Sequence, residues 1–250
     1  MTRLSWRVAG VAFALAALPA AVAARDKYDA RPLTEAATAA LRGKRLAVAR
    51  NELPDVPLAT GDRQDADWRA LRDVRTDPAD LFERELAPAI AREFGMSLRA
   101  GPGVVLASRK PEALAAALPD ADYVLDILVT DRRNQNTPDL KSALRLKPET
   151  LWLGLGVRIQ LENRETGRAV FSGNCYADTF EHPHPPEQRE LAAHEAKLFR
   201  AVFEGLAWRC LRTIARYVPL EEEALPETPG ELVDPLGEFA AKKAAPPGSS

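Results

Sequence analysis

The three histidines are the residues whose type and spacing come nearest to a reactive site. His182, His184 and His194 fall within thirteen residues, and several glutamates lie among them. A proline separates the first two histidines, so their imidazoles could reach one cation, and a nearby carboxylate would complete the site. This pattern keeps an exported metal-dependent hydrolase as an alternative function.

Two features favour a solvated loop over a metal centre at these histidines. Residues 181–187 hold three prolines, and His194-Glu195 is not followed by a second histidine at the helical spacing of zinc proteases. No serine stands in the Gly-x-Ser-x-Gly setting of hydrolases either. We therefore expect a protein that is not an enzyme, with no metal and no cofactor.

The two cysteines form a second pair of chemically active groups. Cys175 falls on a predicted hairpin strand, and Cys210 falls on the apolar stripe of a predicted final helix. Both positions should face the interface between helix and sheet. In an exported protein, two cysteines alone are most simply a disulfide, with two unrelated buried thiols as the alternative. The spacing is not Cys-x-x-Cys, which argues against a redox role.

The amino terminus has the features of a secretory signal. Arg3 and Arg7 precede an apolar run from Val8 to Leu18, and small residues suited to signal peptidase follow at 21–23. We predict that residues 1–23 form a cleaved signal peptide and that the mature protein is periplasmic. The alternative is a retained membrane anchor, because the apolar stretch approaches the length of a bilayer span.

Composition narrows the class of protein further. The chain has 250 residues, 46% of them hydrophobic and 28% charged, which suits a soluble globular fold. The formal net charge of −2 gives no basic surplus for nucleic acid. Two cysteines are too few for a multi-cysteine zinc site or an iron–sulfur cluster. No other segment reaches the roughly 20 apolar residues of a membrane span, so we expect a mature form that does not span one.

Hydrophobic periodicity predicts one α/β (α+β) domain over residues 44–218. We expect a single mixed sheet of about five strands with helices packed on it, in the order β-α-β-α-β-β-β-α. Residues 24–43 form a lead-in and residues 219–250 a disordered tail in this interpretation. The predicted elements are strands at 44–50, 104–107, 123–129, 151–161 and 169–177, and helices at 77–94, 111–118 and 190–217.

The strand at 151–161 also offers a candidate partner surface. Its aliphatic residues alternate strictly with a second set that includes Trp152, Gly154 and Gly156. Glycines on a strand face permit close approach by another backbone. Either a helix covers this face or it forms a groove for a partner, and Trp152 is then the residue that would meet the partner.

Several short segments together resemble a known group of proteins. They are Ala-Asp-Tyr-Val-Leu-Asp-Ile at 121–127, Leu-Trp-Leu at 151–153, Gly-Asn-Cys at 173–175 and Ala-Trp-Arg-Cys at 207–210. The chain resembles proteobacterial exported proteins of unknown function, many of them lipoprotein-like, in which the two cysteines recur in similar places. The element order is more distantly similar to the α/β domain of the curli secretion channel lipoprotein and to the amino-terminal domain of the Tol-Pal propeller protein.

The resemblance implies a role in the envelope without catalysis. Together with the predicted export signal, it favours a non-catalytic periplasmic interaction or accessory protein whose partner is another envelope protein. A small-ligand-binding protein, with its pocket between the long helix and the sheet, is a further alternative. Thermal stabilisation by a ligand would support that reading.

Overall fold

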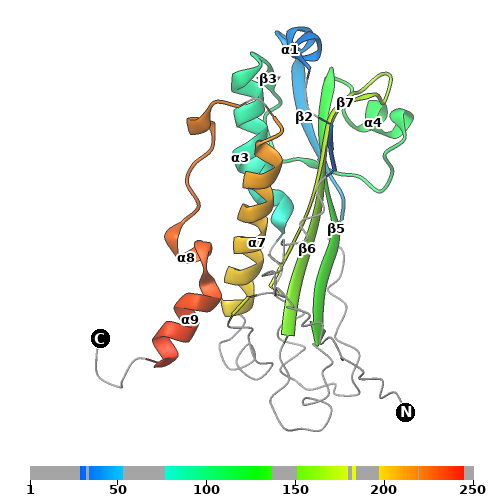
Figure 1. Ribbon diagram of the computed structural model, residues 1–250. Coiled ribbons are helices and arrows are strands. Elements are labelled where there is room, and N and C mark those ends of the chain that lie inside the picture. The colour runs from blue at the N-terminus through cyan, green and yellow to red at the C-terminus, as the bar shows by residue number, and fades with distance from the viewer. Residues whose placement is uncertain are drawn as a thin grey trace, which may run out of the picture.

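The computed structural model describes residues 29–31, 34–52, 77–136, 151–179, 182–183, 197–218 and 220–244. The predicted signal peptide at 1–23 lies outside these residues and stays a prediction. The described part has layers (Figure 1): helices α3 (Pro78–Glu93) and α7 (Lys197–Ala215) cover one face of a sheet, and α4 (Pro111–Ala117) lies on the other side.

One mixed sheet forms the centre of the molecule, which confirms the predicted fold class. Its strands are β1 (Asp29–Arg31), β2 (Arg45–Arg50), β3 (Ser97–Leu98), β4 (Val104–Val105), β5 (Tyr123–Asn136), β6 (Leu151–Asn163) and β7 (Ala169–Asp178). The order is β1-β7-β6-β5-β2-β3, and β4 also pairs with β2. The pairs of β2 are parallel, and those among β5, β6, β7 and β1 are antiparallel.

The predicted element order is confirmed from β2 to α7. The sheet has seven strands where about five were expected, because β1 and β3 are only three and two residues long. Strands this short carry no periodicity of their own. A short helix, α1 (Glu35–Leu41), falls within the predicted lead-in. No helix in the described ranges is both long enough and apolar enough to cross a bilayer.

Local chemistry explains the main boundaries. The Asp77 side chain accepts a hydrogen bond from the Ala79 amide, and Pro78 occupies the first turn, so α3 begins where the sequence predicts. Gly95 follows its end with a φ of 61°. Gly167 has a φ of 62° in the β6–β7 hairpin, a conformation that favours glycine.

Strand β5 is longer than predicted because a bulge lets it continue past its apolar part. The register with β6 shifts between Val129 and Asp131. A Cβ at Gly156 would lie 2.7 Å from the Thr130 Oγ1, so glycine is needed opposite this bulge. The Asn51 side chain bonds both the N–H and the carbonyl of Val129 at 2.9 and 3.0 Å, which extends the pairing beyond the end of β2.

The core lies mainly between the sheet and the pair α3–α7. Its largest fully buried side chains on this side include four phenylalanines: Phe82, Phe171, Phe199 and Phe203. A smaller cluster, including Leu114, Leu118 and Val124, packs α4 against β2 and β5 on the opposite face. The sheet is therefore deeply covered on one side and covered only in part on the other.

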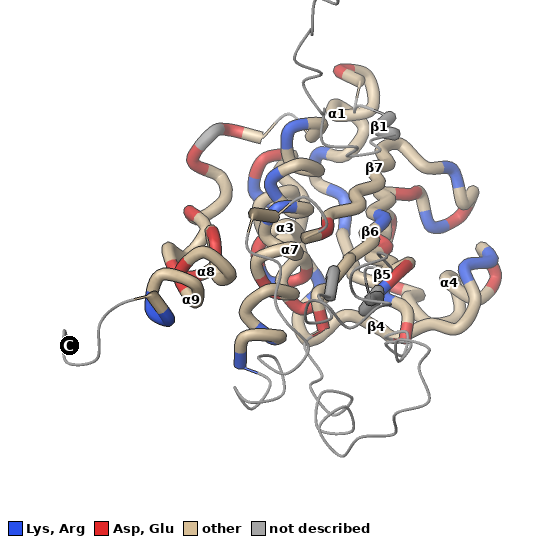
Figure 2. Tube along the Cα trace, turned by 60° about the horizontal axis from the view of Figure 1, so that its bottom comes forward, with Lys and Arg blue, Asp and Glu red and all other residues tan. Residues whose placement is uncertain are grey.

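The carboxyl-terminal segment differs from the disordered tail expected over residues 219–250. A 3-10 turn η1 (Glu222–Ala224) and helices α8 (Gly230–Val233) and α9 (Pro235–Ala244) occupy most of residues 220–244. They run along the outer side of α3 and α7, away from the sheet (Figures 1 and 2). Leu225 and Leu236 are buried there.

Docking on helices α3 and α7 orders this segment despite its prolines and acidic residues. Arg92 donates to the Ala224 carbonyl at 2.9 Å, and Arg212 donates to the Pro226 carbonyl. At Gly205 on α7, a Cβ would lie 2.7 Å from the Leu232 carbonyl oxygen, so the two backbones meet directly. Tertiary contacts of this kind leave no local sequence signal.

Gly205→Ala should release the carboxyl-terminal segment from α7, because the added methyl group would collide with the Leu232 carbonyl. Limited proteolysis should then cut beyond residue 220 faster than in the wild type. Gly230→Ala is the matched control, since nothing lies within 4 Å of a Cβ at that position. Equal cleavage rates in both variants and the wild type would contradict the docked arrangement.

Candidate functional site

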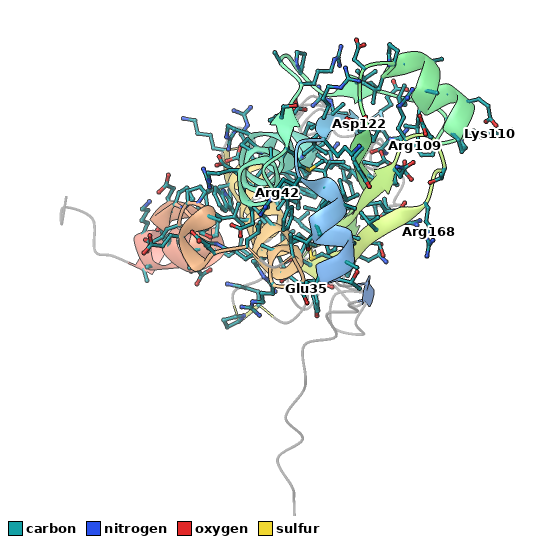
Figure 3. The ribbon with its side chains drawn as sticks, turned by 90° about the horizontal axis from the view of Figure 1, so that it is seen from above. Glu35, Arg42, Arg109, Lys110, Asp122 and Arg168 are labelled. Atoms are coloured by element: carbon teal, nitrogen blue, oxygen red, sulfur yellow. A yellow bond between two sulfur atoms is a disulfide. The ribbon has the colours of Figure 1, made fainter. Side chains whose placement is uncertain are left out.

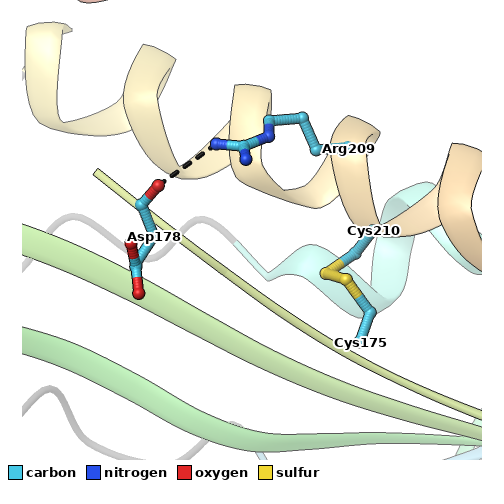
Figure 4. The surroundings of a disulfide bond; sticks show 4 residues. All are labelled: Cys175, Asp178, Arg209 and Cys210. Carbon is cyan, nitrogen blue, oxygen red and sulfur yellow. Dashed lines mark hydrogen bonds between the residues drawn. A yellow bond between two sulfur atoms is a disulfide. The ribbon is translucent and has the colours of Figure 1, made fainter. Parts of the chain in front are cut away.

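The disulfide joins the last long strand to the last core helix. Cys175 on β7 and Cys210 on α7 are bonded, with their Cα atoms 5.4 Å apart (Figure 4). This confirms the predicted pair. Both residues are buried within the main core. Beside the bond, Arg209 donates to the Asp178 carbonyl at 3.1 Å, so a second contact fixes α7 to β7.

The interface between α7 and the sheet is filled with side chains, where a ligand pocket was one alternative. Phe199 and Phe203 pack with their ring centroids 4.8 Å apart. The guanidinium of Arg132, itself buried, lies 5.5 Å from the centre of the Phe203 ring. This region therefore serves the core, and the small-ligand reading gains nothing from it.

The histidine region has a structural contact at its first member. His182 Nε2 lies 2.8 Å from Asp234 Oδ1, and the same oxygen accepts from the Gly237 amide. His182 thus helps to hold the start of α9. His184 and His194 lie outside the described residues. Within the described ranges, no group of three potential ligand residues that could hold a metal ion occurs.

The structure describes only part of the Trp152 surface. The backbone of Trp152 pairs with Gln135 near the end of the β5–β6 ladder, and its side chain lies outside what the structure describes. Close by, the space above Gly156 is taken by the β5 bulge at Thr130 and Asp131. At that glycine the close approach comes from the neighbouring strand, and Trp152 as a residue that meets a partner stays a prediction.

A hollow lies at the edge of the sheet away from β1. There β3 and β4 pair one after the other with the same side of β2. Six residues of chain lead from Leu98 to Val104, while three cover the same stretch of β2, so the chain loops outward between them. The hollow has a volume of about 390 Å³ and is lined by Val48, Asp80, Glu83, Arg84, Leu98, Arg99, Gly101 and Pro102. Leu98 is 37% exposed and Val105 is 53% exposed.

A charge cluster builds one wall of the hollow. Arg50 Nη1 approaches Asp77 and Glu83 at 3.7 and 3.8 Å and also pairs with Asp80. Glu83 accepts from the Gly103 amide at 2.6 Å, which fixes the loop just before β4. Burial raises the pKa of Asp77, although its bond from the Ala79 amide opposes the rise. These contacts make the wall a fixed part of the fold.

The sequence carries a signal for this cluster, although the cluster was not among the predicted sites. Asp77, Asp80 and Glu83 are spaced by three along a predicted helix, which places them along one side of its first turns. Arg50 ends the preceding predicted strand. What the sequence could not show is that this strand end lies against the start of the helix.

A second charged cluster is buried on the sheet face that α4 partly covers. Asp126 on β5 is 1% exposed, and Arg109 Nε donates to its two oxygens at 2.8 and 2.9 Å. Arg109 Nη1 also donates to the Leu106 carbonyl. Figure 3 shows Arg109 between α4 and the sheet, whereas the neighbouring Lys110 projects outward. One guanidinium thus ties the segment before α4 to the centre of the sheet.

Glu162 on β6 belongs to the same cluster. It is 8% exposed, and its Oε1 is buried without a hydrogen-bond partner. Burial, and next the charge of Asp126, raise the pKa of Glu162 to about 7 against the opposing effects of Arg109 and Arg158. Glu162 continues the polar side of an alternating strand, so its sequence position does not distinguish it from an exposed residue.

Comparisons with known proteins do not assign a family. No family model matches the chain, and no curated protein matches it. Among solved structures, the PelC dodecamer from Paraburkholderia phytofirmans is 14% identical with a TM-score of 0.35, covering 78% of this chain and 99% of that one. Lipoprotein GNA1162 from Neisseria meningitidis is 16% identical with a TM-score of 0.32, covering 69% and 99%.

A third similar structure is the hypothetical protein CT253 from Chlamydia trachomatis. It is 12% identical with a TM-score of 0.33 and covers 70% of this chain and 94% of that one. These neighbours are bacterial proteins, and one is described as a lipoprotein. Because all three TM-scores lie below 0.5, they decide neither the family nor the function. The family resemblance drawn from the sequence therefore stays a prediction.

Removing the disulfide should lower the free energy of unfolding by about 4 kcal/mol, the chain-entropy value for a bond that spans 35 residues. The variant is Cys175→Ala with Cys210→Ala, measured by urea denaturation against the oxidised wild type. A loss below about 1 kcal/mol would mean that packing alone holds α7 on the sheet.

Glu162→Gln should remove a pH-dependent loss of stability. The pKa of Glu162 is raised from 4.5 to about 7 by folding. The folded protein therefore retains a proton that the unfolded chain releases, and stability falls as pH rises through this window, by up to about 3 kcal/mol. Denaturation across this pH range should show the fall in the wild type and a flatter profile in the variant. Parallel profiles would contradict the raised pKa.

Proposed function

We propose that this protein is an exported, non-catalytic interaction or accessory protein of the bacterial envelope, and that another envelope protein binds it at the edge surface. The edge surface comprises Leu98, Val105 and the hollow that Leu98 helps to line. The observation that carries the proposal is the exposure of apolar side chains there. Three large apolar residues are exposed in the described part of the chain, and two of them belong to this surface.

The chemistry of the hollow favours a protein over a small apolar molecule. Small-molecule pockets are usually enclosed and mostly apolar. Here the lining includes two acidic and two basic side chains beside Val48, Leu98 and Pro102. An apolar residue flanked by paired charges suits a protein segment that brings both side chains and polar backbone groups.

The charge distribution also suits a protein partner. Acidic and basic residues are interspersed over the described part of the chain (Figure 2). A nucleic-acid partner would require a basic stripe or patch. The edge surface has the same mixture of charges, because Asp80 and Glu83 line the hollow together with Arg84 and Arg99.

Two observations support location in the periplasm. The first 23 residues have the pattern of a cleaved signal. The buried Cys175–Cys210 bond is of the kind that persists in oxidising compartments. The hydrolase alternative has no comparable support, since the one described histidine of the predicted cluster is engaged by Asp234.

Site-specific photo-crosslinking in the periplasm tests the edge surface. A photo-reactive amino acid replaces Leu98, Val105 or, as the control, Val233, which is also exposed but lies on α8. Positions 98 and 105 should yield the same crosslinked exported protein, identified from the joined peptides by mass spectrometry, and position 233 should not.

Three outcomes would contradict the proposal. They are no adduct at either edge position, the same adducts at all three positions, and an adduct formed only with a second copy of this chain. The last result would make the edge surface a contact between identical subunits.

A further inference from the structure

The buried cluster on β5 and β6 has two carboxyl groups, Asp126 and Glu162, and within the described residues only Asp126 is ion-paired. Asp126 on β5 lies opposite Gln160 on β6, and Glu162 lies opposite Val124, so the two acidic side chains project from one sheet face at diagonal positions. Arg109 pairs with Asp126. The charged groups that act on Glu162 are Asp126, Arg109 and Arg158, and Arg158 is exposed to solvent.

Two atoms of the cluster are buried without hydrogen bonds. They are Oε1 of Glu162 and Nη2 of Arg109. Burying a charged group without a partner is unfavourable, and a carboxyl escapes this cost by holding its proton. With Glu162 protonated, Arg109 is free to bond Asp126 through Nε and the Leu106 carbonyl through Nη1.

We propose that Glu162 is a proton-operated switch that controls how firmly β4 is held on the sheet. When Glu162 releases its proton to solvent, the new carboxylate attracts the unbonded Nη2 of Arg109, and this movement of the guanidinium takes Nη1 away from the Leu106 carbonyl. Asp126 and Glu162 then share this cation. The effect on partner binding rests on the proposed function of the edge surface, whereas the switch itself does not.

The contact with Leu106 carries the change to the edge surface. Leu106 directly follows the exposed Val105. Its carbonyl accepts from Arg109, and its amide donates to the Arg50 carbonyl at 2.8 Å. Loss of the first bond removes one of the two hydrogen bonds that hold this residue. The amide of Leu106 therefore reports how well β4 is held.

The direction with pH follows from the chemistry. Below neutral pH the protonated Glu162 leaves Arg109 in place, and the edge surface is firm. Above neutral pH the ionised Glu162 competes for Arg109, and β4 loosens. The pKa of about 7 for Glu162 puts the transition where small changes of pH matter.

Nuclear magnetic resonance of the oxidised full-length mature protein tests the switch. The carboxyl carbon of Glu162 is titrated, and the protection factor of the Leu106 amide against hydrogen exchange is measured on either side of neutral pH. We expect titration near 7 and a protection factor about tenfold lower on the alkaline side. Glu162→Gln should remove this fall. Glu165→Gln, at an exposed position of the same hairpin, should retain it.

Three results would overturn the switch. These are titration of Glu162 near its ordinary value, unchanged protection of Leu106 in the wild type, or an equal fall in the Glu162→Gln variant. The proposed function fails separately, on crosslinking at positions 98 and 105. A pH-dependent Leu106 amide without any crosslinked partner would leave the switch standing and remove the partner.

Discussion

The packing of α7 on the sheet is the interaction on which most of the structure depends. The sheet buries its apolar face against α7 and α3, and the carboxyl-terminal segment docks on the far side of the same helices. Cys175 and Cys210 join this helix to β7 at the middle of the interface. A bond at this place limits how far the unfolded chain can separate two elements that must meet in the core. Losing it would weaken both layers at once.

The two faces of the sheet have different roles because they are covered differently. The α3–α7 face is continuous core. The other face has only the small cluster beneath α4, and charged groups have to be accommodated beside it. Arg109 neutralises the buried Asp126 by bonding to it. Glu162 has no such bond, and its raised pKa means that it holds its proton up to about pH 7. The cluster lies on β5 and β6, and Arg109 connects it to Leu106, which directly follows β4 at the irregular edge. Stability, protonation and the candidate docking surface are therefore connected through a few residues.

Local signals in the sequence predicted much of the fold. The helix predicted from residue 77 begins there because Asp77 and Pro78 act on the nearest backbone groups, and the chain turns at Gly167 between the predicted strands at 151–161 and 169–177. The strict alternation in β6 and the apolar stripe of α7 identified buried faces. The disulfide was predicted because Cys175 on the hairpin partner β7 and Cys210 on that stripe are the two cysteines of a chain with an export signal. Features made by distant segments were missed. The order of residues 220–244 comes from docking on α7 at Gly205, which composition alone does not reveal. The edge hollow and the Glu162 cluster likewise join residues from several elements.

Intact mass measurement of the protein recovered from the periplasm tests the central claim most directly. If the protein is exported and its disulfide forms, the measured mass should match a chain that begins after residue 23. It should also be lower by two hydrogens than the mass of the same chain with free thiols. It should gain them only after denaturation and reduction, because Cys175 and Cys210 are buried. Two free thiols in the native protein, or its absence from the periplasmic fraction, would contradict export into an oxidising compartment and remove the basis for an envelope partner.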